Sequence, residues 1–403
     1  MSQNYQPYQA SMLALGQAPS VIRETFEYGN RRAAEIGREN VFDFSLGNPS
    51  VPAPDSVHDT MRRLMDETDS VLLHGYTSAV GAEPTRSAIA ADINKRFSAG
   101  ISAGNIYMTC GAAASLTVTL HAVLCPGDTC ITFAPFFPEY RVFVEAANAH
   151  LTVVPADLDS FQLNLDAFAQ LVNSETKAVI INTPNNPTGV VYTEENLRKL
   201  CEILRAKEAE YGHPIYLIAD EPYRELVYDA ETVVPYLPNL YDDCFVCYSY
   251  SKSLSLPGER IGYIAVNPRA TDADVIAVIC GQISRGIGHN CPPSIIQLAV
   301  SRVLNETSDL SVYETNMNLL YHKLVELGFT VVKPGGTFYI FPKALEDDAN
   351  AFCMKAKKYD LILVPADNFG CPGYFRMAYC IDTQKVRRSL DVLEKFVREE
   401  YKS

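Results

Sequence analysis

Seven short apolar runs constrain the fold of this chain most strongly. They are 105–108, 129–133, 151–154, 178–182, 215–219, 244–248 and 261–266. Most of them alternate with stretches of helical periodicity, such as 113–124 and 193–211. Continuous apolar runs are typical of strands buried on both faces, and their alternation with helices is typical of a parallel sheet. The sequence therefore predicts an α/β fold, with a three-layer αβα large domain around a mainly parallel seven-stranded sheet.

The two ends of the chain lie outside this pattern. A polar-rich helix is predicted over 20–39, and the Pro- and Gly-rich stretch 45–54 breaks regular structure. Beyond Pro292 we expect two helices, two strands and a final helix, at 296–304, 313–327, 329–332, 337–341 and from Thr383 onward. We therefore predict a large domain over 51–290 and a smaller α+β domain over 291–403, with residues 1–50 packing with the smaller domain.

Charge and hydropathy exclude several functional classes. The net charge of −14 opposes non-specific binding to nucleic acid or to anionic membranes. There is no apolar run of about 18 residues, which a membrane-spanning helix needs. Residues 1–17 lack the basic and apolar regions of a secretory signal. We expect a cytoplasmic protein without a nucleic-acid or membrane partner.

The cysteines do not indicate a disulfide framework or a metal site. There are 11 of them, an odd number, scattered along the chain. The tightest pair, Cys244 and Cys247, falls in a predicted strand, where residues i and i+3 face opposite ways and cannot hold one metal ion. We expect reduced thiols and no bound metal.

Polar or small groups follow four of the apolar runs. They are Gly111–Ala113, Asn182–Gly189, Asp220–Tyr223 and Ser249–Ser253. Each has an ordinary structural interpretation: a strand-to-helix turn, an Asn-Pro turn, a helix N-cap and a solvated lysine. In doubly wound sheets, however, ligands bind where the strands end, and a helix N-terminus there can hold an anion. Together the four groups indicate a ligand site at one edge of the sheet.

In chain order these residues resemble the class I and II aminotransferases, pyridoxal-phosphate enzymes of fold type I in the aspartate aminotransferase superfamily. The resemblance covers nearly the whole chain and is carried by Gly47, Tyr76, Gly81, Gly111, Asn186–Gly189, Asp220, Tyr223, Ser249, Ser251, Lys252, Arg260, Pro334–Phe338 and Arg376. It implies that pyridoxal 5′-phosphate is the cofactor. It also implies transfer of the α-amino group of an L-amino acid, with an aspartate-like donor as one candidate, to a 2-oxo acid.

The resemblance implies a chemical role for four residues around the cofactor ring. Lys252 would form a Schiff base with the cofactor aldehyde and later move the Cα proton as an acid–base group. Asp220 would keep the pyridine nitrogen protonated. Tyr223 and Asn186 would hydrogen-bond the phenolic oxygen of the ring.

The resemblance also assigns the groups that hold the cofactor and the substrate. Phe137 would stack on the ring, with Phe136 as the alternative, and Arg376 would bind the substrate α-carboxylate beside Gly47. Tyr76 would reach the cofactor phosphate of the partner subunit, so the enzyme would be a homodimer. The remaining phosphate ligands would be Arg260, Ser249, Ser251 and the backbone of Gly111, Ala112 and Ala113.

The sequence departs from the family pattern at three places. Ala112 and Ala113 offer no side-chain donor where many relatives have Ser, Thr or Gln. The chain has no tryptophan, so the stacking residue cannot be one. The segment 286–293 does not clearly match the family segment that binds the distal carboxylate of the substrate. We interpret the nearby Arg285 as a solvated or structural arginine.

Two other functions remain open. A β-eliminating C–S lyase of the same fold would use the same Lys252, Asp220 and Arg376, because it also begins with Cα–H cleavage. A non-enzymatic aminotransferase-like domain of a transcription regulator would carry a DNA-binding domain ahead of the fold. About 45 residues precede Gly47, and they show no winged-helix pattern.

Overall fold

Seven strands form one sheet in the computed structural model, which describes residues 8–17, 21–229 and 231–402. The strands are β2 (Ile106–Thr109), β3 (Thr129–Phe133), β4 (His150–Val154), β5 (Thr176–Asn182), β6 (Tyr216–Asp220), β7 (Cys244–Ser249) and β8 (Gly262–Val266). Their order across the sheet is β2-β8-β7-β6-β5-β3-β4. Strand β8 runs antiparallel to β2 and β7, and the other neighbouring pairs are parallel. The predicted α/β fold with a mainly parallel sheet is confirmed.

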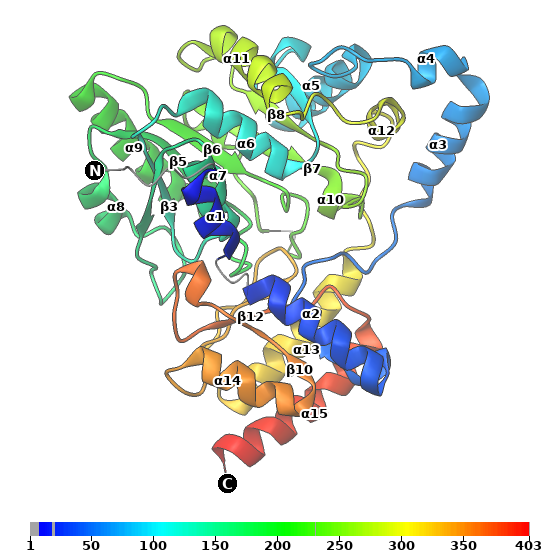
Figure 1. Ribbon diagram of the computed structural model, residues 1–403, viewed down its shortest axis with the longest axis vertical. Helices are drawn as coiled ribbons and strands as arrows, with labels where there is room; N and C mark the ends of the chain where they lie inside the picture. The colour runs from blue at the N-terminus through cyan, green and yellow to red at the C-terminus, as the bar shows by residue number, and fades with distance from the viewer. Residues whose placement is uncertain (1–7, 18–20, 230, 403) are drawn as a thin grey trace.

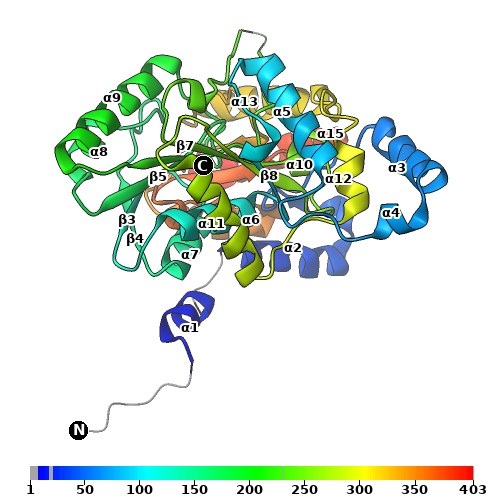
Figure 2. The ribbon, with the colours of Figure 1, turned by 90° about the horizontal axis from the view of Figure 1, so that it is seen from above.

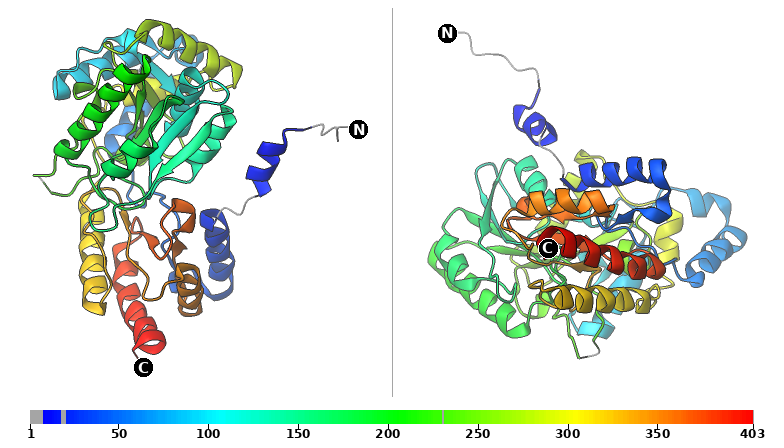
Figure 3. Two further views of the ribbon diagram at one scale, coloured as in Figure 1. Left: turned by 90° about the vertical axis from the view of Figure 1, so that its left-hand side faces the viewer. Right: turned by 90° about the horizontal axis from the view of Figure 1, so that it is seen from below.

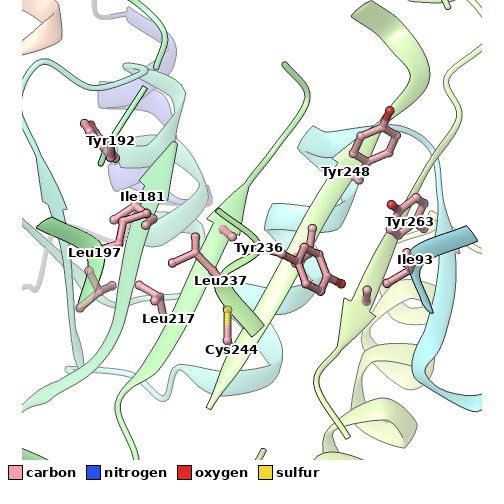
Figure 4. Close-up of a cluster of buried hydrophobic side chains, with 14 of the residues drawn as sticks. Ile93, Ile181, Tyr192, Leu197, Leu217, Tyr236, Leu237, Cys244, Tyr248 and Tyr263 are labelled. Atoms are coloured by element: carbon pink, nitrogen blue, oxygen red, sulfur yellow. The ribbon is translucent and has the colours of Figure 1, made fainter. Parts of the chain in front are cut away.

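Helices cover both faces of this sheet. One face packs against α6 (Ala112–Val123), α7 (Glu139–Ala146) and α11 (Ala273–Gly286). The other packs against α5 (Glu83–Phe97), α8 (Leu165–Leu171), α9 (Glu194–Tyr211) and α12 (Ser294–Val300), with α3 (Asp55–Glu67) and α4 (Ser70–His74) beside α12. Figure 4 shows part of the second core, in which Leu217 and Cys244 lie beneath Leu237.

The alternation of side chains along the strands explains the two cores. On β7, Phe245 and Cys247 belong to the core under α6, whereas Cys244 and Val246 belong to the opposite core. The two cysteines of the C-x-x-C pattern therefore point to opposite faces, as the period of a strand requires. All 11 cysteines are free thiols in the structure.

A second lobe surrounds two small sheets. Strands β11 (Val364–Pro365), β12 (Phe375–Ala378) and β9 (Tyr339–Ile340) form an antiparallel sheet in that order, and β1 (Phe42–Asp43) pairs in parallel with β10 (Leu361–Ile362). The helices of this lobe are α2 (Val21–Ile36), α13 (Ser311–Leu327), α14 (Ala349–Ala356) and α15 (Thr383–Tyr401). Phe42 and Phe44 share its core with Phe352 and Phe375, so a segment early in the chain packs with late ones. The boundaries predicted near residues 50 and 290 stay a prediction.

The two lobes lie one above the other, with the large sheet in the upper lobe and the helices α13, α14 and α15 in the lower one (Figure 1). The left panel of Figure 3 shows the same division from the side. Helix α1 (Ala10–Gln17) stands away from the body of the molecule in Figures 2 and 3. Within the described residues, no helix has both the length and the apolar character needed to cross a membrane.

The strand predicted at 329–332 is wrong. Phe329 N instead completes the end of α13 by donating to Leu324 O at 3.0 Å, and Lys343 N donates to Thr330 O at 2.9 Å without a regular ladder. Phe329 is buried in the core of the second lobe, so its run is apolar because it packs, not because it pairs. The predicted start of the first helix at Ser20 lies outside the described residues, as do residues 1–7 of the segment inspected for a signal.

Candidate active site

Three parallel strands end side by side at one edge of the large sheet. In the strand register, Asn182 of β5 lies beside Asp220 of β6, which lies beside Cys247 of β7. A cavity of about 270 Å³ opens at this edge and is lined by both lobes. Of the predicted site residues, those lining it are Gly47, Ala112, Ala113, Phe137, Asn186, Asp220, Tyr223, Ser249, Ser251, Lys252, Arg260 and Arg376. The structure thus brings together groups that are up to 329 positions apart, from Gly47 to Arg376.

Lys252 lies on α10 (Tyr250–Ser253), a four-residue helix that directly follows β7. The side chain of Ser249 caps this helix by accepting a hydrogen bond from Ser251 N at 3.2 Å. Lys252 Nζ donates to Gly47 O at 2.7 Å. Burial lowers the pKa of Lys252 to about 8, and the guanidinium groups of Arg260 and Arg376 act in the same direction. A larger share of the amine is therefore neutral and nucleophilic near neutral pH.

Asp220 has a buried carboxylate, and one of its two oxygens accepts a hydrogen bond. Its Oδ2 accepts a hydrogen bond from the Tyr140 hydroxyl at 2.6 Å, whereas Oδ1 is buried without a partner in the described structure. Burial raises the pKa of Asp220 to about 7, although the Tyr140 bond acts in the opposite direction. The side chain caps no helix, because Asp220 is the last residue of β6 and a turn follows it. A ligand that presents a proton-bearing nitrogen would satisfy Oδ1.

Tyr140 was missed by the sequence reasoning, which considered only the phenylalanines before it. Tyr140 is the second residue of α7, three residues after Phe137, and the two ring centroids lie 5.7 Å apart in an edge-to-face arrangement. The signal that could have found it is this spacing, which puts both residues on one side of a helical turn. Phe137 lines the cavity, whereas Phe136 is buried in the core beside α6 and lies against Gly370.

The start of α6 and Arg260 form an anion cradle. Gly111 caps α6 with φ +88°, and a Cβ there would lie 2.8 Å from Arg260 Nη2, so the guanidinium packs directly on the glycine. The first backbone N–H groups of a helix have no partner within the helix and favour an anion. Gly111 itself does not line the cavity, but Ala112 and Ala113 do.

Arg376 is a buried cation in strand β12, with 2% of its surface exposed. Its Nη2 donates to Ser45 O at 2.6 Å and its Nη1 to Asn186 Oδ1 at 3.2 Å, while Nε has no partner among the described residues. Among the described residues, no carboxylate forms an ion pair with Arg376 either. A buried guanidinium that lacks a counter-ion is well suited to bind a carboxylate from outside.

These groups fit the predicted cofactor. Pyridoxal 5′-phosphate presents an aldehyde, a pyridine nitrogen, a flat ring and a phosphate. The cavity offers an amine of lowered pKa, an unsatisfied carboxylate oxygen, the Phe137 ring and the cradle at Arg260. Each group of the cofactor would find one matching partner.

Residues 39–393 match the family model described as aminotransferase class I and II. The chain belongs to the class I and II aminotransferase family. It is therefore a pyridoxal 5′-phosphate-dependent aminotransferase, and the predictions of enzyme class and cofactor are confirmed.

Relatives of this aminotransferase resemble it over nearly their whole length. The aspartate aminotransferase of Thermotoga maritima is 29% identical over 384 residues, which cover 93% of this chain and 97% of the relative. A probable N-acetyl-LL-diaminopimelate aminotransferase of Bacillus subtilis is 28% identical over 372 residues, 89% of this chain and 90% of the relative. The crystal structure of an aminotransferase from Eubacterium rectale superposes with a TM-score of 0.95 at 49% identity, covering 98% of this chain and 100% of that one. All three carry the name aminotransferase, so the C–S lyase alternative is not favoured, but their names do not agree on a substrate.

Three successive carbonyls of the aminotransferase's 45–47 loop accept hydrogen bonds from side chains of other segments. Ser45 O accepts from Arg376, Leu46 O from Cys380 Sγ at 3.6 Å, and Gly47 O from Lys252. A Cβ on Gly47 would overlap the Tyr339 hydroxyl, so this close approach needs a glycine. Tyr339 also contacts the Tyr223 hydroxyl at 3.2 Å. Tyr339 directly follows the Pro334–Phe338 motif but was not among the predicted site residues.

Two predicted features of the aminotransferase lie away from the cavity of their own chain. Tyr76 is fully exposed in the loop after α4 and does not line the cavity. Arg285 is exposed in the last turn of α11, as expected for a solvated arginine. The described residues contain no group of three His, Cys, Asp or Glu side chains that could hold a metal ion.

Proposed function

We propose that this aminotransferase holds pyridoxal 5′-phosphate through Lys252 and binds the α-carboxylate of an L-amino acid donor through Arg376. One observation carries the proposal: Lys252, Asp220 and Arg376 line the same cavity, and within the described part of the chain Asp220 Oδ1 and Arg376 Nε have no hydrogen-bond partner. When bound, the cofactor supplies an electron-accepting ring that takes up the electron pair left when a substrate Cα–H bond breaks.

Lys252 would act as the proton carrier of the reaction. Its Nζ, once released by the incoming amino acid, accepts the proton from the substrate Cα and donates it elsewhere in the same cavity. Its pKa of about 8 suits both steps, because neither protonation state is strongly favoured near neutral pH.

Asp220, Tyr223 and Asn186 would set the charge distribution of the bound ring. Asp220 Oδ1 accepts the hydrogen bond of the pyridine nitrogen and thereby holds the proton there. Pairing with that cation lowers the raised pKa of Asp220, so the carboxylate stays ionised in the loaded enzyme. Tyr223 and Asn186, which already line the cavity, donate to the phenolic oxygen.

The remaining predicted residues would fix the position of the ligands. Arg260, Ser249, Ser251 and the start of α6 bind the phosphate, and Phe137 covers the ring face. Arg376 binds the substrate carboxylate with Gly47 beside it. An aspartate-like donor is one candidate, supported by the name of the Thermotoga maritima relative, and the acceptor is a 2-oxo acid.

We further propose a homodimer in the cytoplasm. Tyr76 would complete the phosphate site of the partner subunit. On the adjoining helix α4, Val71 and Leu72 expose 78% and 75% of their surfaces, which suits burial against a second subunit. The free thiols support a reducing compartment.

Replacement of Lys252 tests the central role. We expect Lys252→Ala to abolish turnover and the visible absorption of covalently held cofactor while the protein stays folded. Lys199→Ala is the matched control, because Lys199 is an exposed lysine that forms a surface salt bridge with Glu195. Turnover of Lys252→Ala near that of the wild type would contradict the proposal.

A single-turnover measurement separates transfer from elimination. An amino acid added without an acceptor should release a 2-oxo acid and leave the amino group on the enzyme, ready for a second 2-oxo acid. Release of pyruvate with ammonia or a thiol, and no amino group retained, would instead support the lyase. Donors should be screened with 2-oxoglutarate, oxaloacetate and pyruvate as acceptors.

A further inference from the structure

A chain of hydrogen bonds runs behind the cavity without lining it. The Tyr248 hydroxyl donates to Glu225 Oε2 at 2.8 Å and contacts Ser253 Oγ at 3.0 Å. Arg96 Nη2 donates to the other carboxylate oxygen of Glu225 at 3.1 Å. None of these four side chains belongs to the cavity lining.

The positions of these residues along the chain connect them to the site. Glu225 follows Tyr223 by two residues, and Ser253 directly follows Lys252. Tyr248 directly precedes Ser249, the residue that caps the lysine-bearing helix α10. The hydrogen-bond chain therefore joins the segment after β6 to the segment after β7, which are the two segments that present Tyr223 and Lys252.

The number of available protons fixes which group donates in each of these hydrogen bonds. The Tyr248 hydroxyl has one proton, and it donates that proton in a hydrogen bond to the Glu225 carboxylate, which also pairs with Arg96. The Ser253 hydroxyl must then donate to the Tyr248 oxygen. Tyr248 and Ser253 are both buried, so loss of either partner leaves a polar group without water to replace it.

Helix α10 depends on such anchors because it has only four residues, too few to be stable alone. Backbone bonds hold its two ends: Tyr250 N donates to Ile261 O at 3.1 Å, and Ser308 N donates to Ser253 O at 2.8 Å. Neither bond reaches the Tyr223 side of the cavity. The Tyr248 ring is itself fixed by stacking on Tyr263, with ring centroids 5.0 Å apart.

We propose that Glu225, Tyr248 and Ser253 are positioning residues that hold Lys252 in place relative to Asp220 and Tyr223. The inference rests on the role proposed for Lys252. The inference predicts different effects on kcat and KM. Proton transfer at Lys252, which determines kcat, depends on these hydrogen bonds, whereas substrate binding, which determines KM, depends on Arg376 of β12 in the other lobe.

Tyr248→Phe is the direct test, because it removes the hydroxyl and keeps the buried ring. We expect kcat to fall on the order of tenfold to a hundredfold, as for small misplacements of a reacting group. The KM for the amino acid should stay within about twofold, since Arg376 is untouched. Tyr236→Phe is the matched control: its hydroxyl is also buried, but it has no hydrogen-bond partner among the described residues, and its ring stacks on Phe97.

A second readout uses the cofactor-free protein. The pH dependence of acylation at Lys252 by acetic anhydride, followed by mass spectrometry, reports the titration of its amine. In the wild type this amine faces Arg260, Arg376 and the Cys380 thiol. A loosened α10 exposes the amine to water, so we expect the midpoint in Tyr248→Phe to rise toward that of an ordinary lysine. Tyr236→Phe should keep the wild-type midpoint.

Further variants keep the test decisive if Tyr248→Phe folds poorly. Ser253→Ala should reproduce both effects, and the double variant should cost no more than the larger single change. Glu225→Gln retains one acceptor oxygen for the Tyr248 hydroxyl, so it should keep more of the wild-type kcat than Glu225→Ala, which retains none. Wild-type kcat and midpoint in Tyr248→Phe and Ser253→Ala, or equal losses in Tyr236→Phe, would overturn the inference. If instead Lys252→Ala kept the cofactor covalently bound, the proposed function itself would fall.

Discussion

At the scale of single residues, the cavity concentrates groups that a stable core would avoid. Asp220 leaves one oxygen unpaired, and Arg376 leaves Nε unpaired and has no counter-ion among the described residues. A buried polar atom without a partner destabilises the folded state by about 1 to 3 kcal/mol. Both residues therefore weaken the free protein and would recover that loss when a ligand binds.

The effect of Asp220→Asn on stability should depend on pH, and this dependence measures the cost of burying the Asp220 carboxylate. The folded pKa of about 7 lies above the ordinary 3.8, so the folded chain keeps a proton that the unfolded chain loses between these values. The stability of the cofactor-free wild type thus decreases as pH rises through this interval. Asparagine does not ionise, so Asp220→Asn should be more stable than the wild type at pH 8, by about 1 to 4 kcal/mol.

Urea denaturation of both cofactor-free proteins at pH 8 and at pH 5 measures the effect. The advantage of Asp220→Asn should be smaller at pH 5, where the wild type has lost less stability. An equal difference at both pH values would refute the explanation. The variant should also lose aminotransferase activity, because a neutral amide cannot hold the ring proton.

The sequence predicts those site residues that directly follow an apolar run. Lys252, Asp220 and Asn186 follow apolar runs, and the end of a run marks the edge of the sheet. Tyr140 was not found because its contact with Asp220 spans 80 positions. Tyr339 meets Tyr223 across 116 positions, and no spacing in the sequence reports such a contact.

At the scale of secondary-structure elements, apolar runs report burial more reliably than pairing. All seven runs of the large sheet are strands, because helices cover both of its faces. In the run at 329–332, Phe329 is buried in the core of the second lobe, but Thr330 is exposed and the segment forms no ladder. Short strands such as β1 and β10, with two residues each, are invisible to any periodicity.

The connection from β2 to α6 gives a test of the anion cradle. Gly111→Ala must displace the Arg260 guanidinium, whereas Gly127 has a similar φ of +91° and a Cβ there would meet no described residue within 4 Å. Both variants should lose about 1 to 3 kcal/mol of stability through backbone strain at a positive φ. Only Gly111→Ala should also weaken cofactor binding, by roughly tenfold, which is the loss of about one hydrogen bond.

Fluorescence titration of the two cofactor-free variants with pyridoxal 5′-phosphate gives the dissociation constants. A similar loss of affinity in both variants would show that strain, and not the position of Arg260, is responsible.

Strand β12 gives a second test, because it carries a cation where a strand core would have an apolar residue. Arg376→Met fills the space between the Tyr339 and Phe369 rings without a charge. Replacing a buried ion by an apolar side chain is often neutral or stabilising by about 1 to 4 kcal/mol. We expect unchanged or higher stability, together with a KM for the amino acid raised on the order of a hundredfold, equivalent to about 3 kcal/mol.

Arg269→Met is the control for this change, because Arg269 is exposed and pairs with Asp242 at the surface. It should alter neither stability nor KM appreciably. Marked destabilisation by Arg376→Met would mean that Arg376 is needed for the fold rather than for the substrate.

At the scale of the whole molecule, the cavity belongs to neither lobe alone. The large sheet presents Lys252 and Asp220, and the second lobe presents Arg376. The change of pattern near Pro292 predicts a second domain, and the domain boundaries stay a prediction. The place of Tyr76 in a partner subunit was implied only by the family resemblance, because nothing along one chain reports a contact with another.

Mixing two inactive variants tests that shared site. In a hybrid dimer of Lys252→Ala with Tyr76→Ala, one site would combine an intact Lys252 with an intact Tyr76 from the partner. Random reassortment should restore up to about a quarter of the wild-type activity. Activity after subunit exchange, measured against each variant alone, is the readout. No gain on mixing, when exchange itself is demonstrated, would exclude the proposed contribution of Tyr76.

The 45–47 loop has a consequence for every affinity measured on this enzyme. In the free chain its carbonyl oxygens engage Arg376 and Lys252, so the protein's own main chain stands in for the ligands. Once Lys252 is joined to the proposed cofactor, Gly47 O has to find another donor. Loading is then an exchange of partners rather than an addition, and a dissociation constant reports only the difference between the two sets of contacts. A loop sequence that held these side chains less well would make the enzyme appear to bind more tightly, although no ligand contact had changed.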